Sequence, residues 1–225
     1  MEFSEVMSTT FAARDFTDEH ISDDQLYTIL DNARFAPSGG NRQGWKVIIV
    51  RDTQVKKQLG ELCWPAMRIA AAQMKAGETY WQSVEPTSVD IKSAADDESL
   101  PIAIPMFKNL GEVPVVCIIT VDLRVVASMD MHLDRIGVVS GASIYPFAWS
   151  VLLSARNEGL GGALTTLVAS AEPKVQKLLG LETHDAVAAM LTIGKPVKQI
   201  TKLSRKPVEE FTFINHTSGQ ALTRP

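Results

Sequence analysis

Residues 36–50 read Ala-Pro-Ser-Gly-Gly-Asn-Arg-Gln-Gly-Trp-Lys-Val-Ile-Ile-Val, from Ala36 to Val50, and this stretch predicts a polar loop directly before a buried strand. The proline fixes one backbone φ angle, and the glycines lack the Cβ atoms that would keep a ligand away from the backbone. Serine, asparagine and glutamine side chains add hydrogen-bonding groups that can contact a polar heteroatom. The pattern fits a ligand-binding loop or an ordinary turn, since the same residue types favour turns for local reasons.

A helix precedes this loop. Ser22 is followed three residues later by Gln25, which is the pattern of a capping box, and apolar residues then recur at helical spacing. The helix must end before Pro37, because the residue that precedes a proline avoids the helical conformation. The spacing of apolar residues from Phe3 onward predicts a second, short helix at the N-terminus.

The rest of the chain alternates between helical and strand-like patterns and has no internal repeat. The patterns predict further helices over residues 53–62, 138–157 and 172–179, and strands over residues 47–50, 113–121, 163–168 and 186–193. Such alternation indicates an α/β or α+β protein.

Residues 64–110 lack this regularity, because polar runs and three prolines interrupt them. We expect one domain over residues 1–225, and a connection of this length within a compact domain is usually functional. Residues 64–110 are therefore predicted to form a lid or excursion, with a surface insertion of no such role as the alternative.

The composition excludes several classes of protein. A net charge of −4 gives no electrostatic reason to expect nucleic acid as a partner. No apolar run reaches the roughly 18 residues of a membrane span, and the N-terminus lacks the pattern of a secretion signal, so we expect a cytoplasmic protein without membrane contact. The four histidines show no metal-ligand spacing, and we predict no metal site.

Three segments, taken in order, resemble the flavin-dependent nitroreductase family. Arg14-Asp15-Phe16 is similar to the end of its Arg-Ser-x-x-Arg-x-Phe stretch, and residues 36–45 are close to its Ala-Pro-Ser-x-x-Asn-x-Gln-Pro-Trp loop. Residues 158–162, with residues 193–196, resemble its Gly-Leu-Gly turn and its Ile-Gly-x-Pro strand end. The ordered set of three is far more specific than any one of them.

The resemblance implies an α+β, nitroreductase-like fold, with a central, mostly antiparallel sheet flanked by helices. It also implies an intertwined homodimer in which FMN lies at the subunit interface and the C-terminal tail embraces the partner. A cleft between two subunits suits a cofactor because it excludes water on most sides.

The resemblance further implies which residues bind the flavin. Arg14 would lie beside N1 and O2 of the ring, where a fixed positive charge stabilises the reduced anion. Arg205 would bind the phosphate, and Asn109 is a further candidate at the pyrimidine. The other implied contacts are Pro37, Ser38, Gly39 and Asn41 from the partner subunit, and Leu164, Thr165 and Thr166, whose backbone amides approach N5 and O4.

The chain departs from the family pattern ahead of Arg14. Thr10 and Ala12 stand where the family commonly has an additional arginine and a serine, so one phosphate contact and one hydroxyl are absent. This difference predicts weaker FMN binding or a changed specificity.

The implied reaction is a ping-pong transfer in which NADH or NADPH gives a hydride to flavin N5. An acceptor such as a nitroaromatic or quinone then takes the electrons. The flavin carries the chemistry, so no protein side chain is predicted to be catalytic, and the absence of a Ser–His–Asp set is consistent with this. Residues 64–110 include aromatic and methionine side chains that would contact a flat acceptor or pack within the protein: Trp64, Met67, Met74, Tyr80, Trp81, Met106 and Phe107.

Two other functions stay open. A reductive dehalogenase of the same fold would use a lid glutamate, tyrosine and lysine to bind an amino-acid zwitterion, and Glu78, Tyr80 and Lys92 supply those residue types. A non-catalytic flavin-binding module is the other alternative, because part of the phosphate anchor is missing.

Overall fold

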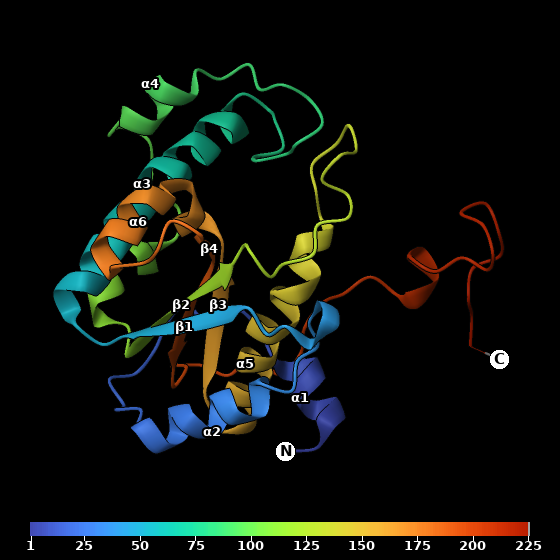
Figure 1. The fold of residues 1–225 in the computed structure, drawn as a ribbon, viewed down its shortest axis with the longest axis horizontal. Coiled ribbons are helices and arrows are strands. Elements are labelled where there is room, and N and C mark those ends of the chain that lie inside the picture. The colour runs from blue at the N-terminus through green and yellow to red at the C-terminus, as the bar shows by residue number, and fades with distance from the viewer. Residues whose placement is uncertain (225) are drawn as a thin grey trace.

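The computed structural model describes residues 1–224, which form a four-stranded antiparallel sheet between two layers of helices (Figure 1). The strands lie in the order β1-β2-β4-β3, so that β1 and β3 are the two edges. Their bounds are Trp45–Val50 for β1, Val115–Asp122 for β2, Gly161–Thr165 for β3 and Asp185–Gly194 for β4. The predicted α+β class and antiparallel sheet are confirmed.

Helices cover both faces of the sheet. Their bounds are Phe3–Thr9 for α1, Asp23–Ala33 for α2, Thr53–Lys75 for α3, Ile91–Asp96 for α4, Tyr145–Asn157 for α5 and Glu172–Leu179 for α6. Helices α2 and α5 pack on one face, and α3 and α6 pack on the other (Figure 1). Within residues 1–224, no helix combines the length and apolar character needed to cross a membrane.

The two central strands supply both hydrophobic cores. Successive residues of a strand point to opposite faces. Ile119 and Leu191 therefore pack with α2 and α5, whereas their neighbours Ile118 and Met190 pack with α3 and α6. Strand β2 is buried along almost its whole length, as expected for a strand covered on both faces.

Local sequence signals define several helix ends. The capping box at α2 is confirmed: Gln25 N donates to Ser22 Oγ at 3.2 Å, and Ser22 N donates to Gln25 Oε1 at 3.0 Å. The predicted helix over residues 172–179 coincides with α6, and Pro146 lies in the first turn of α5, where a proline breaks no hydrogen bond of the helix.

Three predicted bounds were wrong. Helix α3 passes residue 62 and Pro65 and continues to Lys75, because Cys63 and Met67 bury apolar surface in the second core. The loss of one helical hydrogen bond at a proline costs roughly 3 kcal/mol, which this packing offsets. The strand predicted over residues 163–168 ends at Thr165, and the helix predicted from residue 138 begins at Tyr145.

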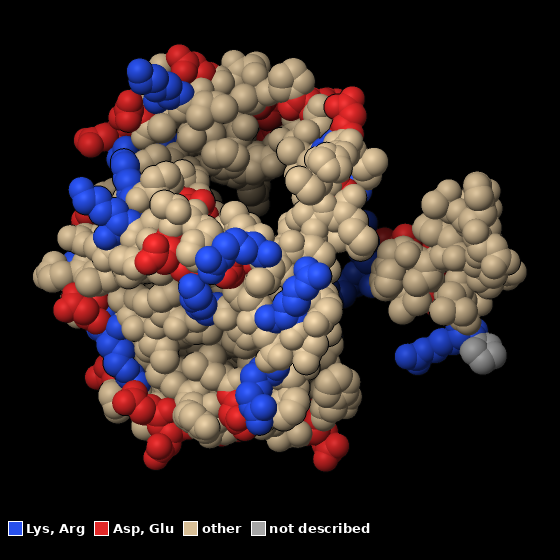
Figure 2. Space-filling model, viewed as in Figure 1, with Lys and Arg blue, Asp and Glu red and all other residues tan. Residues whose placement is uncertain are grey.

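The segment after β4 leaves the body of the protein. It first passes α1, where Gln199 Nε2 donates to the carbonyl oxygen of Thr9 at 3.0 Å. Beyond this contact it extends away, and its last part stands apart in both views (Figures 1 and 2). In this tail, residues 201–224, five large apolar side chains are exposed: Val208, Phe211, Phe213, Ile214 and Leu222. Large apolar side chains gathered on one exposed segment are unusual on the surface of a monomeric protein.

Candidate functional site

The loop before β1 is rigid and held from within. Gln43 N donates to Ser38 Oγ at 2.9 Å, and Gln43 Nε2 donates to Asn41 Oδ1 at 3.1 Å. Gly40, Asn41 and Gln43 have φ angles of 61°, 53° and 47°. Glycine and asparagine adopt this left-handed region more easily than most residues, which explains two of these three identities. Pro37, Gly39 and Asn41 are exposed, and Ser38 is half-buried.

Residues distant in sequence fix this loop to the protein. Gly39 N donates to Ser143 Oγ at 3.0 Å, and the ring of Trp45 stacks on Phe147 with centroids 4.7 Å apart. Sequence reasoning missed Ser143, because it lies about a hundred residues further on and no local pattern links it to the loop. The loop thus presents its exposed backbone from a fixed support.

Arg14 lies in a short segment tied to the ends of two strands. Ala13 N donates to the carbonyl oxygen of Gly162 in β3 at 3.0 Å. Thr17 N donates at 2.8 Å to the carbonyl oxygen of Lys195, the residue directly after β4. The side chain of Arg14 is exposed, and among residues 1–224 it forms no salt bridge and makes only a 3.4 Å hydrogen bond to the carbonyl oxygen of Ala12. The backbone around Arg14 is therefore held in place, and its guanidinium is available to a ligand.

Arg14 and Asn109 line one small pocket, of about 80 Å³, together with Glu112 and Val113. These residues come from two segments that are about 90 residues apart in the chain. The pocket joins a cation, an amide and a carboxylate, which can donate to carbonyl oxygens and accept from a ring N–H. The structure thus places Asn109 and Arg14 at one pocket.

Two side chains of α3 position the wall of this pocket. Lys56, which is 5% exposed, donates from Nζ to the carbonyl oxygen of Val113 at 2.5 Å. Burial lowers the pKa of Lys56, because the charged form loses solvation. Trp64 Nε1 donates to the carbonyl oxygen of Phe107 at 3.0 Å. Both ends of the pocket-lining segment are therefore attached to the same helix.

The third predicted segment lies where β3 ends. Leu164 is paired with Leu191, and Thr165 with Met190, whereas Thr166 follows the strand and is exposed. The hydroxyl of Thr165 accepts from Leu167 N at 3.3 Å, which turns the chain into a short 3-10 helix, η5 (Leu167–Ala171).

The loop and the end of β3 do not meet within one chain. The loop enters β1 and Thr166 leaves β3, and these are the opposite edges of the sheet. Three strand spacings separate the edges, which is about 14 Å at about 4.8 Å for each spacing. Two of the predicted groups therefore lie apart in the single chain.

Arg205 is also distant from the other predicted groups. It lies in the exposed tail, and its guanidinium donates only to the carbonyl oxygen of Ser204, its neighbour in the chain. The structure therefore shows no contact of Arg205 with Arg14, with the loop or with the end of β3.

The seven aromatic and methionine side chains named for residues 64–110 differ in exposure: on α3, Trp64 is half-buried and Met74 is exposed. Met67, Met106 and Phe107 are buried in the second core, so they offer no surface to an acceptor. Tyr80 and Trp81 are 55% and 45% exposed on the segment after α3.

The cysteines and the possible metal ligands among residues 1–224 do not form a reactive site. Cys63 and Cys117 are buried and unpaired, and burial raises the pKa of each thiol to about 12. No group of three or more histidine, cysteine, aspartate or glutamate side chains in this range could hold a metal ion.

Known proteins resemble this chain in sequence and in fold. Iodotyrosine deiodinase 1 from Pongo abelii is 24% identical over 217 residues, which is 95% of this chain and 68% of that protein. A BluB-like flavoprotein from Clostridium difficile 630 superposes with a TM-score of 0.70 at 20% identity, covering 96% of this chain and 100% of the other. Oxidised iodotyrosine deiodinase bound to FMN and 3-iodo-L-tyrosine gives a TM-score of 0.66 at 20% identity, covering 92% and 96%.

A match over most of the chain assigns the protein to a family. A sequence model described as the Nitroreductase family matches residues 9–195, a range that includes Arg14, the loop before β1 and the end of β3. The chain belongs to the Nitroreductase family.

Proposed function

We propose that this protein is an FMN-dependent oxidoreductase that passes electrons from NADH or NADPH to a flat acceptor such as a nitroaromatic or a quinone. Bound FMN would supply hydride and electron transfer through N5. The observation that carries the proposal is the convergence of Arg14 and Asn109 on one pocket, in a chain of the Nitroreductase family.

The residues at this pocket fit a flavin. Arg14 would donate to O2 and oppose the negative charge that forms near N1 on reduction. Asn109 would hydrogen-bond to the pyrimidine edge, and the backbone after Thr165 would approach N5 and O4. The exposed glycines of the loop before β1 leave room for a ring to lie flat against the backbone.

The protein would act as a homodimer, with each flavin site shared between two copies. The loop and the end of β3 lie at opposite edges of one sheet, so a ring bound at the end of β3 would meet the loop of the partner subunit. The apolar tail supports this proposal, because it extends from the body with its large side chains uncovered. In the dimer, the tail would bring Arg205 to a flavin phosphate.

The phosphate anchor would be weaker than in most relatives. Thr10 is buried and donates its hydroxyl to the carbonyl oxygen of Val6 at 2.7 Å, so this group is already used within α1. Ala12 offers no side-chain donor. Arg205 would then be the principal cation at the phosphate.

The visible spectrum of the purified protein, before and after addition of FMN, tests the proposal. We expect flavin absorbance, and its loss on anaerobic addition of NADH or NADPH, followed by recovery when a quinone is added. A protein that binds FMN but is not reduced by either nicotinamide would instead be a non-catalytic flavin-binding module. A protein that stays colourless with excess FMN would refute both proposals.

Reductive dehalogenation is the second candidate, favoured by the similarity to iodotyrosine deiodinase over 95% of the chain. The lid residues give it less support. The carboxylate of Glu78 already accepts from Thr87 Oγ1 at 2.5 Å and from the backbone N and hydroxyl of Ser88 at 2.8 and 2.6 Å. A zwitterion would have to displace these bonds. Iodide release from 3-iodotyrosine by the reduced protein would establish this function, and its absence would exclude it.

Two further predictions remain part of the proposal. Residues 64–110 would act as a lid through the exposed part after Lys75, and the protein would be cytoplasmic. Neither is needed for the flavin chemistry.

A further inference from the structure

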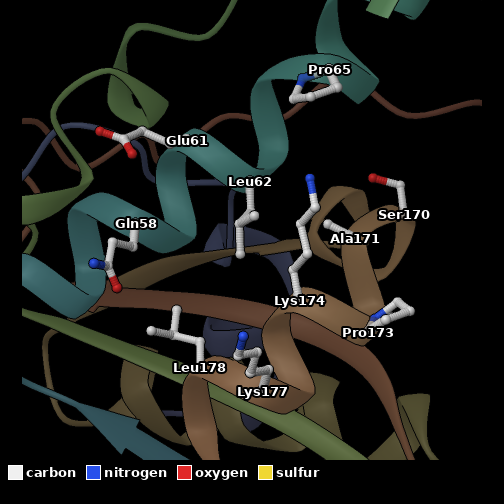
Figure 3. Close-up of a pocket in the computed structure, with 10 residues that line it drawn as sticks. All are labelled: Gln58, Glu61, Leu62, Pro65, Ser170, Ala171, Pro173, Lys174, Lys177 and Leu178. Atoms are coloured by element: carbon white, nitrogen blue, oxygen red, sulfur yellow. The ribbon is translucent and has the colours of Figure 1, made fainter. Parts of the chain in front are cut away.

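A second pocket lies between α3 and α6, away from the residues grouped around Arg14. It has a volume of about 790 Å³, which is within the range of pockets that bind drug-sized molecules. Figure 3 shows its two walls, one from Gln58, Glu61, Leu62 and Pro65 of α3 and the other from α6 and the end of η5. None of these residues belongs to the predicted flavin site.

The base of this pocket is apolar. Leu62 and Leu178 lie on facing helices, and both are half-buried against the second core. Their side chains point into the space between the helices (Figure 3). Pro65 and Pro173 add apolar surface at the rim. An aliphatic or aromatic body placed here would remove exposed apolar surface from water, which favours binding.

The charged side chains of the pocket favour a ligand with a negative charge. Lys174 and Lys177 lie three residues apart on one face of α6, and within residues 1–224 neither forms a salt bridge. Figure 3 shows the Lys174 side chain extending from α6 toward α3, whereas the carboxylate of Glu61 points away from both lysines. The opposite face of α6 is fixed, because Glu172 Oε2 accepts from Val187 N at 2.6 Å and Gln176 Nε2 donates to the carbonyl oxygen of Asp185 at 3.1 Å.

We propose that the pocket between α3 and α6 binds an amphipathic small-molecule anion, with an apolar body between Leu62 and Leu178 and a carboxylate or sulfonate at Lys174 and Lys177. This site is separate from the flavin site, and its existence does not depend on the function proposed above. An anion would relieve the repulsion between the two ammonium groups, and a hydrogen bond to a charged partner is stronger than one to a neutral group.

The probes for this proposal are 2-naphthoate and its uncharged analogue, 2-naphthamide, added to the full-length protein with FMN present. Leucine methyl groups are labelled with carbon-13, and Leu62→Ile and Leu178→Ile variants assign their signals. We expect 2-naphthoate to shift the methyl signals of Leu62 and Leu178 and to bind roughly tenfold more tightly than 2-naphthamide. In the Lys174→Gln, Lys177→Gln double variant, the preference for the anion should disappear.

Lys57→Gln is the matched control, because Lys57 is exposed on α3 but does not line the pocket. It should bind both probes as the wild type does. The proposal is overturned if neither leucine responds to 2-naphthoate, if the amide binds as tightly as the anion, or if the double variant keeps the preference. Because the readout is local to Leu62 and Leu178, binding of the probe at the flavin would not be mistaken for binding in this pocket.

Discussion

Replacement of Arg14 by glutamine should separate flavin binding from stability. In the part of the chain that the structure describes, the guanidinium is exposed, lacks an acidic partner and makes one long hydrogen bond, of 3.4 Å, to the carbonyl oxygen of Ala12. Its removal should change the free energy of unfolding by less than about 0.5 kcal/mol. A hydrogen bond from a charged donor contributes about 1.5–3 kcal/mol, so the Kd for FMN should rise about 10- to 100-fold.

The assay is titration of FMN fluorescence with the apoprotein, with thermal unfolding measured on the same samples. Arg34→Gln is the control, since Arg34 is exposed, pairs with Asp31 at 2.6 Å and lies over the ring of Phe35, its neighbour in the chain. It should leave the Kd unchanged. If Arg14→Gln is folded and binds FMN within twofold of the wild type, Arg14 does not contact the flavin and the assignment is wrong.

Three more predictions concern the scaffold. Gly162→Ala should lower the free energy of unfolding, measured in urea, by at least about 2 kcal/mol, because a Cβ there would lie 2.2 Å from the carbonyl oxygen of Thr192. A smaller loss would show that β3 and β4 can move apart to admit the methyl group. The pKa of Cys63 is raised to about 12, so folded protein at pH 8 should not react with Ellman's reagent, and rapid labelling before unfolding would contradict this. Hydrogen bonds from Val138 N and Arg135 lower the pKa of Asp130 to about 2, so its carboxylate should stabilise the fold above about pH 4 and lose this effect as the pH falls toward 2. The difference in Tm between wild type and Asp130→Asn should therefore shrink over that interval, and a difference that stays constant down to pH 2 would refute the reasoning.

Local signals in the sequence predicted local structure well. The capping box of Ser22 and Gln25 located the start of α2, and the apolar pattern of residues 172–179 predicted α6 in full. Helix α3 was predicted too short, because Pro65 is a strong local signal and the burial of Met67 that overrides it depends on distant residues. The strand predicted through Val168 failed for a related reason, since threonine and valine favour strands wherever packing does not decide otherwise.

The candidate site was predictable in its parts but not in its arrangement. Residue types indicated the loop before β1, whereas Arg14 and the end of β3 were predicted from the resemblance to a family. The order of strands, which places two of these groups at opposite edges, depends on pairing between segments far apart in the chain. The same holds for Ser143, whose hydroxyl accepts from Gly39 N, and for the shared pocket of Arg14 and Asn109. Contacts of this kind leave no periodic signal in a sequence.

The central claim is that each flavin site takes Arg14 from one copy and the loop before β1 from the other. A dimer that combines an Arg14→Gln chain with a Gly39→Val chain tests it most directly. A Cβ at Gly39 would meet Ser143 Oγ at 3.4 Å and Ala127 Cβ at 3.7 Å, which is ordinary van der Waals contact, and the two methyl groups of valine would obstruct a ring against the loop.

The two chains, with different affinity tags, are expressed together, and the mixed dimer is isolated through both tags. If the site is shared, the mixed dimer has one intact site, and we expect about half the FMN content of the wild type, whereas either parent dimer binds little. A mixed dimer that binds no more FMN than its parents would contradict the account.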